Sequence, residues 1–267
     1  DMDSVLSRML SDELQPGTTN RDFVKALAGL VNLQGGYAFG EYTRTVEITL
    51  RALGLPEGAV VLLSPLAPQV YHAAVRAGGY VPYYVDVSES APVLNAGTLS
   101  EAVEDSSAAA VVLDANLGFL PDYEKLEDLN VPIIEDVSSG IGGYVGERGA
   151  GSVGRLVVLS LGQGGVITAG AGGAVLCRNT RDKSALTSVL ESYPEEVLLS
   201  DMNAALGLTQ IKQLEQFLTR RREIAAVLLR ALQRSRHRVP VQPGEGENVW
   251  ATFPTLIDGS LGEVQQY

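Results

Sequence analysis

The stretch Ser160-Leu-Gly-Gln-Gly-Gly-Val-Ile-Thr-Ala-Gly-Ala-Gly-Gly173 joins two short apolar runs, and the rest of the chain can be interpreted around it. Six of its fourteen residues are glycine. Glycine at this density indicates that the backbone adopts positive φ angles or passes close to another group. The apolar runs on either side, 156–160 and 173–177, predict two neighbouring strands with the glycine-rich turn between them.

Upstream of this turn, short apolar runs alternate with segments of helical periodicity. The alternation predicts strands at 59–63, 80–85, 109–113 and 131–134, and helices at 43–53, 70–77, 99–103 and 123–129. Strands separated by helices of this length are typical of right-handed βαβ units. We therefore predict an α/β fold with three layers, α/β/α, around a mainly parallel sheet of about seven strands.

The two ends of the chain predict smaller units beside this sheet. Residues 3–14 and 20–31 show helical spacing, with Asn20 as the N-cap of the second helix, and we interpret 1–34 as an N-terminal helical arm. The large domain is then 35–235, and it includes a long helix at 201–234. A strand predicted at 250–257 would begin a small C-terminal α/β domain, 236–267, which we expect to be truncated.

Composition limits the classes of partner. The net charge is −12 and the pI is about 4.6, so a nucleic acid or an anionic membrane would be repelled. We interpret the arginines between 220 and 238 as the solvated face of a helix. One cysteine, Cys177, and the absence of a signal sequence or an apolar span predict a cytoplasmic protein.

Several common kinds of site are not supported by the sequence. Gly162-Gln-Gly164 begins like a dinucleotide fingerprint, but Ile167 stands where the third glycine belongs. No Gly-Lys-Ser/Thr phosphate loop occurs in the chain. The only histidines, His72 and His237, predict neither a metal cluster nor a Ser-His-Asp triad.

One carboxylate stands at a position where ligands bind. Glu135 and Asp136 follow the strand predicted at 131–134, and ligands of open α/β sheets bind beyond the carboxyl ends of the strands. Asp136 could therefore hold a cationic ring nitrogen or a hydroxyl group. It could equally cap the turn at 138–140, and both interpretations stay open at this stage.

Seven motifs occur in an order that resembles one known family. They are Leu50-Arg-Ala-Leu-Gly54, Val85-Asp-Val87, Val131-Pro-Ile-Ile-Glu-Asp-Val-Ser-Ser-Gly-Ile-Gly142, Gly151-Ser-Val-Gly154, Ser160 with Gly170-Ala-Gly-Gly173, Asn203-Ala-Ala-Leu-Gly-Leu-Thr-Gln210 and Arg220-Arg-Arg-Glu-Ile-Ala225. This order is similar to that of the DegT/DnrJ/EryC1/StrS aminotransferases, which have the type I aspartate aminotransferase fold and depend on pyridoxal phosphate. The resemblance covers about 35–230 and implies a homodimer that takes a sugar-nucleotide ligand.

The resemblance also implies roles for individual residues. Asp136 matches the carboxylate that holds the protonated pyridine nitrogen, which makes the ring an electron sink. Ser160 matches a hydroxyl that binds the cofactor phosphate, and Ser139 stands where a Gln or His usually touches the cofactor. Tyr42 and Thr43 fall within the segment that cradles the phosphate at the start of a helix.

The departures from the family bear most on function. Gly165 stands where the family has the lysine that forms the Schiff base, and glycine can neither form an imine nor transfer a proton. Glu41 begins the phosphate segment, and Glu196 falls near the position of an asparagine that the partner subunit donates to the phosphate. Two acids would repel a dianion, so we expect weakened binding of pyridoxal phosphate.

Three interpretations follow. The first is a non-catalytic or repurposed small-molecule-binding member that lost its lysine. The alternative is a pyridoxal-phosphate aminotransferase acting on a nucleotide-linked keto sugar, with a lysine supplied from elsewhere. In the third, the vacated pocket serves an enzyme of different chemistry. The sequence alone therefore leaves the enzymatic status open.

Overall fold

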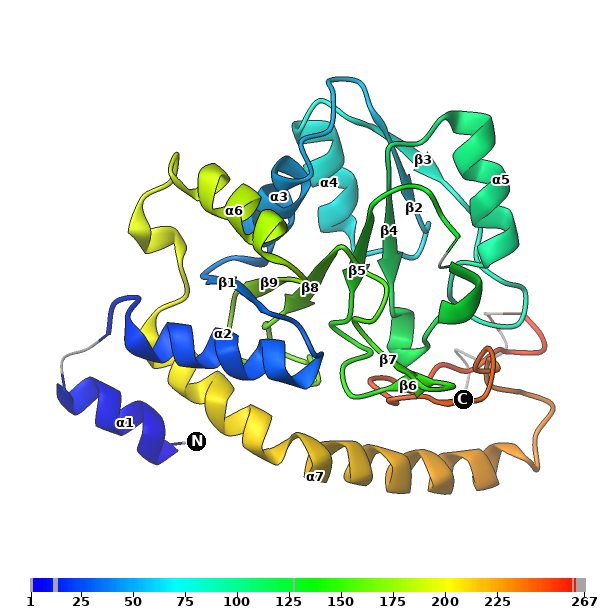
Figure 1. The fold of residues 1–267 in the computed structure, drawn as a ribbon. Helices are drawn as coiled ribbons and strands as arrows, with labels where there is room; N and C mark the ends of the chain where they lie inside the picture. The colour runs from blue at the N-terminus through cyan, green and yellow to red at the C-terminus, as the bar shows by residue number, and fades with distance from the viewer. Residues whose placement is uncertain (1, 12–13, 127, 261, 263–267) are drawn as a thin grey trace.

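A computed structural model describes residues 2–11, 14–126, 128–260 and 262, and its centre is a seven-stranded sheet (Figure 1). The strand order is β1-β9-β8-β5-β4-β2-β3. The strands are β1 (Gly35–Phe39), β2 (Val60–Leu63), β3 (Val81–Tyr84), β4 (Ala110–Asp114), β5 (Ile133–Asp136), β8 (Leu156–Ser160) and β9 (Gly173–Cys177). Only β9 runs against its two neighbours in this sheet. The predicted mainly parallel sheet is confirmed.

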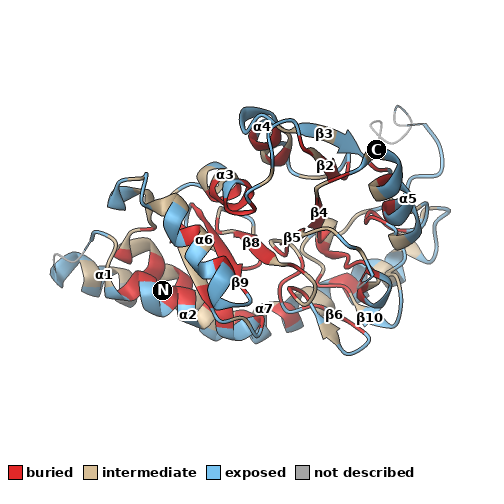
Figure 2. Cartoon of the chain, turned by 45° about the horizontal axis from the view of Figure 1, so that its top comes forward, coloured by how far each residue is buried: buried red, intermediate tan, exposed pale blue. Residues whose placement is uncertain are grey.

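Helices cover both faces of the sheet (Figures 1 and 2). One face carries α3 (Tyr42–Ala52), α4 (Gln69–Ala77) and α6 (Thr180–Leu190), and the other carries α2 (Thr18–Leu30), α5 (Ala96–Ser106) and α7 (Asp201–Leu232). Successive strand residues alternate between two buried clusters: Val112 packs toward α3 and α4, and Val111 toward α5. The three-layer architecture is confirmed, and α1 (Met2–Ser11) packs against α7.

Strand β1 was not predicted from the sequence. Its sequence, Gly-Gly-Tyr-Ala-Phe, begins with two glycines, which are depleted in strands, and contains no β-branched residue, so its two aromatic residues gave only a weak strand signal. Glycine is required by packing: a Cβ at Gly36 would lie 2.0 Å from the carbonyl oxygen of Val175 in β9. The outer edge of β1 is partly covered, because the Leu199 N–H donates to the carbonyl oxygen of Ala38 at 2.9 Å.

The start of α2 corrects the predicted N-cap. Gly17, not Asn20, is the N-cap residue, and no side chain within the helix caps it. The buried carboxylate of Asp201, the first residue of α7, instead accepts the N–H groups of Gly17, Thr19 and Asn20 at 2.8, 3.0 and 2.8 Å. A residue distant in sequence therefore satisfies the free N–H groups at this helix end.

The C-terminal segment contradicts the strand predicted at 250–257. The described strand is instead β10 (Gly246–Glu247), which pairs with β6 (Tyr144–Val145), itself paired with β7 (Arg148–Gly149). Trp250 has a φ of 54°, which interrupts extended backbone, and its ring stacks on Phe253. Leu256 contributes only an isolated bridge to Arg238.

The helix predicted at 123–129 is reduced to the 3₁₀ turn η2 (Tyr123–Leu126), and residue 127 lies outside the described residues. Two further 3₁₀ turns are η1 (Asn116–Gly118) and η3 (Glu195–Val197). In the ranges that the structure describes, no helix combines the length and apolar character that a membrane span requires.

The basic cluster on α7 does more than face solvent. Arg221 donates to the carbonyl oxygens of Trp250 and Ala251 at 3.2 and 2.9 Å, and Arg222 pairs with Glu247 at 2.8 Å. The interpretation of a purely solvated face is wrong at these two positions. The two arginines hold the C-terminal segment against α7.

Candidate functional site

Asp136 is the centre of the candidate site and lies at the carboxyl end of β5, a strand in the middle of the sheet. The side chain is buried, and both of its oxygens accept hydrogen bonds. Oδ2 accepts hydrogen bonds from the hydroxyls of Tyr42 and Tyr71, and the bond from Tyr71 is 2.7 Å long. Oδ1 accepts hydrogen bonds from the hydroxyl of Ser138 and from its backbone N–H, the latter bond being 2.8 Å long. Four donors from within the chain therefore surround one carboxylate.

The two tyrosines reach Asp136 from the first turns of α3 and α4. Their rings meet edge to face, with centroids 6.4 Å apart. Gly173, the first residue of β9, leaves room for the Tyr42 ring, because a Cβ there would lie 3.0 Å from Tyr42 Cδ2. The pKa of both phenols lies well above the usual value, mainly because the rings are buried and, as a second cause, because Asp136 is negatively charged. Both groups therefore remain protonated donors at neutral pH.

Ser138 connects Asp136 to the glycine-rich turn. The Ser160 N–H donates to Ser138 Oγ at 2.7 Å, and Ser160 Oγ accepts the Gly162 N–H at 3.4 Å. The structure thus brings together three of the predicted site residues, Tyr42, Asp136 and Ser160. It also shows that Asp136 caps the turn that begins at Ser138, one of the two interpretations left open by the sequence.

Two other predicted site residues stay outside this network. Thr43 is exposed on the first turn of α3, and Ser139 is half-buried in the turn after β5. Neither side chain forms a hydrogen bond with any residue that the structure describes. Their predicted contact with a cofactor remains a prediction.

A second buried carboxylate, which was not predicted from the sequence, lies beside Asp136. Asp114 ends β4 and is directly in register with Asp136 across the parallel pair. The side chain is buried, and Oδ2 has no hydrogen-bond partner among the described residues. Burial and the neighbouring Asp136 raise the pKa of Asp114 to about 7. An acid at the end of a buried strand was the available signal, as it was for Asp136.

Glu135 has a structural role on the other face of the sheet. Its carboxylate accepts the N–H groups of Gly151, Val153 and Gly154 at 2.6, 3.1 and 2.7 Å. Burial raises its pKa. A Cβ at Gly154 would lie 2.6 Å from Glu135 Cβ, so this loop requires glycine. Glu135 therefore fixes the loop before β8, and of the two acids that end β5 only Asp136 faces the candidate site.

The glycine-rich turn folds back on itself at Gly165. A Cβ there would lie 2.9 Å from the carbonyl oxygen of Ile167 and 3.4 Å from that of Gly162. Gly164, Gly170 and Gly172 have φ angles of 87°, 86° and 94°, which are unfavourable for other residues. Any larger residue at position 165 requires the backbone of the turn to move.

None of the four lysines belongs to the Asp136 network. Lys25 and Lys183 lie on α2 and α6, Lys212 is exposed on α7, and Lys125 pairs with Asp122 at 2.7 Å. All four are within the described residues, and none forms a hydrogen bond with Asp136 or Ser160. The ranges described also contain no group of three or more His, Cys, Asp or Glu side chains suited to a metal ion.

The two glutamates singled out in the sequence share one cavity. Glu41 and Glu196 line a space of about 450 Å³ between the start of α3 and the segment 193–197. Arg44 also lines it, but its guanidinium pairs with Glu47 and lies 5.5 Å from the centroid of the Tyr193 ring. Because the one arginine is already paired, this cavity is unfavourable for a phosphate group.

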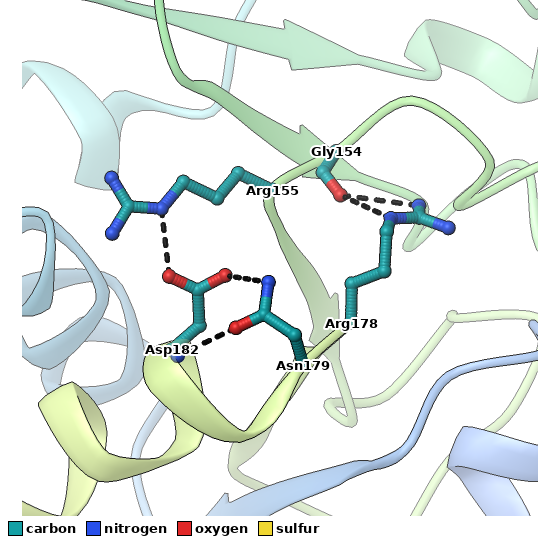
Figure 3. A network of polar contacts seen from close by, with 5 residues as sticks. All are labelled: Gly154, Arg155, Arg178, Asn179 and Asp182. Carbon is teal, nitrogen blue, oxygen red and sulfur yellow. Dashed lines mark hydrogen bonds and ion pairs between the residues drawn. The ribbon is translucent and has the colours of Figure 1, made fainter.

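A separate polar network anchors the opposite end of β8 (Figure 3). Arg155 Nε pairs with Asp182 Oδ1 at 2.8 Å, and Asn179 both caps α6 and donates to Asp182 Oδ2 at 2.8 Å. Arg178 donates to the carbonyl oxygen of Gly154. This network joins α6 to the amino end of the strand that leads to Ser160.

Comparison with known proteins agrees with this fold. The model of the DegT/DnrJ/EryC1/StrS aminotransferase family matches residues 1–266, and the chain belongs to this family. A curated relative from Campylobacter jejuni, UDP-4-amino-4,6-dideoxy-N-acetyl-beta-L-altrosamine transaminase, is 24% identical over 242 residues. The match covers 83% of the chain and 64% of that relative, so the chain spans less than two thirds of its length.

Other relatives and solved structures give the same result. GDP-perosamine synthase of Escherichia coli O157:H7 is 25% identical over 204 residues, with 69% of the chain and 55% of the relative covered. The aminotransferase TlmJ from Streptoalloteichus hindustanus superposes with a TM-score of 0.88 at 21% identity, over 96% of the chain and 75% of TlmJ. Escherichia coli GDP-4-keto-6-deoxy-D-mannose-3-dehydratase with bound hydrated PLP superposes with a TM-score of 0.87 at 17% identity, over 98% of the chain and 77% of the dehydratase. These superpositions establish the fold.

Proposed function

We propose that this chain is a member of the sugar aminotransferase family that does not transaminate and that binds a small molecule, such as a nucleotide sugar, without pyridoxal phosphate. The observation that carries the proposal is the contact of Tyr42 and Tyr71 with Oδ2 of Asp136. Asp136 is the residue that the family resemblance assigns to the pyridine nitrogen. With two phenols on one oxygen and Ser138 on the other, its acceptor capacity is already used.

The residues present do not fit pyridoxal phosphate in three further respects. Gly165 supplies no amine at the position that the resemblance assigns to the lysine, and the turn has no room there for a Cβ. Glu41 and Glu196 place negative charge beside the first turn of α3, where the resemblance places the phosphate. We therefore derive no catalytic step through this cofactor.

A second candidate function is transamination of a nucleotide-linked keto sugar. The comparisons favour this candidate over the first, because relatives are named as a transaminase of a UDP-linked amino sugar and as GDP-perosamine synthase. On this alternative, the lysine would come from one of the four in the chain after a rearrangement, or from another chain. The local chemistry around Asp136 and Gly165 is the argument for preferring the first candidate.

Absorption spectroscopy separates the two candidates. Purified protein is incubated with excess pyridoxal phosphate, dialysed, reduced with borohydride and digested for mass spectrometry. Our proposal predicts no retained visible absorption and no cofactor adduct on Lys25, Lys125, Lys183 or Lys212. A stoichiometric adduct on one lysine, together with amine transfer to a nucleotide-linked keto sugar, would establish the second candidate instead. Thermal shifts with nucleotide sugars then test small-molecule binding directly.

We also propose that the chain forms a homodimer. Helix α1 exposes an apolar face formed by Leu6, Met9 and Leu10, the last 88% exposed, and such faces mark interaction surfaces when they are contiguous. Sedimentation should give twice the chain mass of 28.3 kDa at micromolar concentration. Leu10→Glu should shift the protein toward the monomer, whereas Val241→Glu, at an exposed site on another segment, should not. A wild-type monomer would exclude the dimer.

The division into an arm at 1–34, a large domain at 35–235 and a C-terminal unit from 236 is likewise our proposal. The exposed residues 233–236 that follow α7 support its second boundary. Limited proteolysis should cut first near this boundary. Early cleavage inside 35–235 would contradict the division.

A further inference from the structure

A second cavity lies at the opposite end of the sheet from Asp136. It has a volume of about 560 Å³ and is bounded by the first half of α2, the start of β1, α6 and the segment that leads into α7. Because β1 is parallel to β5, the amino end of β1 lies at the edge of the sheet where the strands begin, and the carboxyl end of β5 lies at the edge where they end. No residue of the Asp136 network lines this cavity.

The cavity gathers positive charge in an acidic protein. Arg21, Lys25 and Lys183 line it, with Glu195 as the one acid, so the ionisable side chains sum to +2 (three cations minus one anion), whereas the chain carries −12. None of the three cationic side chains forms an ion pair or hydrogen bond with a described residue. All three cations and Glu195 are exposed, so they are hydrated in the free protein and accessible to an anionic ligand.

A neighbouring arginine-lined cavity provides the contrast. It has a volume of about 390 Å³ and includes Arg155 and Arg178 (Figure 3). Both of these guanidiniums are occupied, by Asp182 and by the carbonyl oxygens of Gly151 and Gly154. Those arginines stabilise the fold, whereas the cations beside β1 remain available to a ligand.

The three cations approach the same strand edge from two helices. Arg21 and Lys25 are four residues apart on α2, so they share one face of the helix. Like charges at this spacing destabilise a helix unless an anion compensates them. From α6, Lys183 Nζ lies 3.8 Å from the position that a Cβ of Gly35 would occupy.

The backbone of β1 adds a hydrogen-bond donor to this edge. Ala38 directs its carbonyl outward to Leu199, and residues two apart along a strand direct their N–H and C=O groups to the same side. Gly36, which lines the cavity, therefore directs its N–H outward as well. The N–H groups at the start of α2 are not available, because Asp201 accepts them.

We propose that this cavity binds a small polyanion that carries two or more phosphate groups, such as a nucleoside diphosphate or pyrophosphate. Its volume is within the range of small-molecule sites. A guanidinium can bind a phosphate through two parallel hydrogen bonds, and the two ammonium groups neutralise further charge. Glu195 opposes the anion and lowers its affinity. This site is independent of the function proposed for the Asp136 network.

Isothermal titration calorimetry with pyrophosphate and with ADP tests the proposal on the full chain. We expect both to bind, with affinity that falls as the salt concentration rises. Lys183→Met and Arg21→Met should each weaken binding at least tenfold, and Glu195→Gln should strengthen it. Citrate, which carries carboxylates in place of phosphates, should bind more weakly than pyrophosphate.

Lys212→Met is the matched control, because this lysine is exposed on α7 and lies outside the cavity. It should leave the affinity unchanged, and unfolding curves of all four variants should show that each is folded. Absence of pyrophosphate binding to the wild-type chain would overturn the proposal. So would equal losses in Lys183→Met and Lys212→Met, because these would indicate a response to net charge alone.

Discussion

Tyr42 and Tyr71 donate their hydroxyls to the same carboxylate oxygen, Oδ2 of Asp136. One atom on a central strand therefore joins the first turns of two helices, α3 and α4, which cover the same face of the sheet. Water has little access to these three side chains, and the low local dielectric strengthens each hydrogen bond between them. The arrangement fixes the carboxyl end of β5 as well as closing the space in front of it.

Tyr42→Phe tests the energetic role of this contact. The ring remains, but Asp136 Oδ2 loses one of its two donors inside the protein. We expect the free energy of unfolding to fall by about 1–3 kcal/mol in urea titrations. Tyr37→Phe is the control, because the Tyr37 hydroxyl bonds Thr187 at the surface, and its effect should stay within about 0.5 kcal/mol. Equal losses in the two variants would contradict the assigned role of Tyr42.

Asp114 predicts a pH-dependent stability. Its pKa rises from 3.8 to about 7 on folding, so between these values the folded protein retains a proton that the unfolded chain releases. Stability therefore falls as the pH rises through this window, by at most about 4 kcal/mol for a shift of about three units.

Asp114→Asn removes this titration while keeping the shape of the side chain. Urea unfolding at pH 5 and at pH 8 should show that the variant gains stability relative to the wild type as the pH increases. Parallel pH profiles for the two proteins would mean that Asp114 ionises normally in the folded state.

Two helical glycines predict opposite responses to alanine. A Cβ at Gly207 in α7 would lie 2.5 Å from the Phe23 ring, so Gly207→Ala should destabilise the protein by about 1–3 kcal/mol. A Cβ at Gly29 in α2 would meet no atom within 4 Å, so Gly29→Ala should stabilise it by up to about 1 kcal/mol. Thermal unfolding of both variants checks the signs. The close contact of α2 with α7 would be wrong if Gly207→Ala were neutral.

Asp201 predicts a large effect from a single cap. Asp201→Asn replaces a buried carboxylate that accepts three N–H groups at the start of α2. We expect a loss of about 2–3 kcal/mol, since hydrogen bonds to a charged acceptor are the stronger kind. Asp258→Asn, at an exposed aspartate, is the control and should change stability by less than about 0.5 kcal/mol. Hydrogen exchange should also show faster opening at Thr19 and Asn20 in Asp201→Asn only.

Much of the fold could be predicted from local patterns. The strand boundaries at 156–160 and 173–177 agree with the structure, because both are apolar runs buried on two sides. Strand β1 could not be found this way, since its glycines reflect the close approach of β9 rather than a local preference. The predicted cap at Asn20 was wrong for the same reason, because the side chain that caps α2 is that of Asp201, 184 residues from Gly17 in the sequence.

The candidate site was only partly predictable for a similar reason. Asp136 was identifiable because a carboxylate followed an apolar strand. Tyr71 carried no signal, because nothing in the helical pattern of 70–77 distinguishes a ring that packs from one whose hydroxyl reaches another strand. Asp114 became significant only once the parallel register placed it beside Asp136.

The position of β1 has a consequence for the order in which the chain can fold. The five residues of β1 pair with β9, whose residues are made more than 130 positions later, so a nascent chain that ends at β8 leaves Gly35–Phe39 without its partner strand. Closing so long a loop is an entropic burden that slows folding. Until Gly173–Cys177 emerges from the ribosome, the first strand is an unpaired edge that a chaperone or another nascent chain could bind.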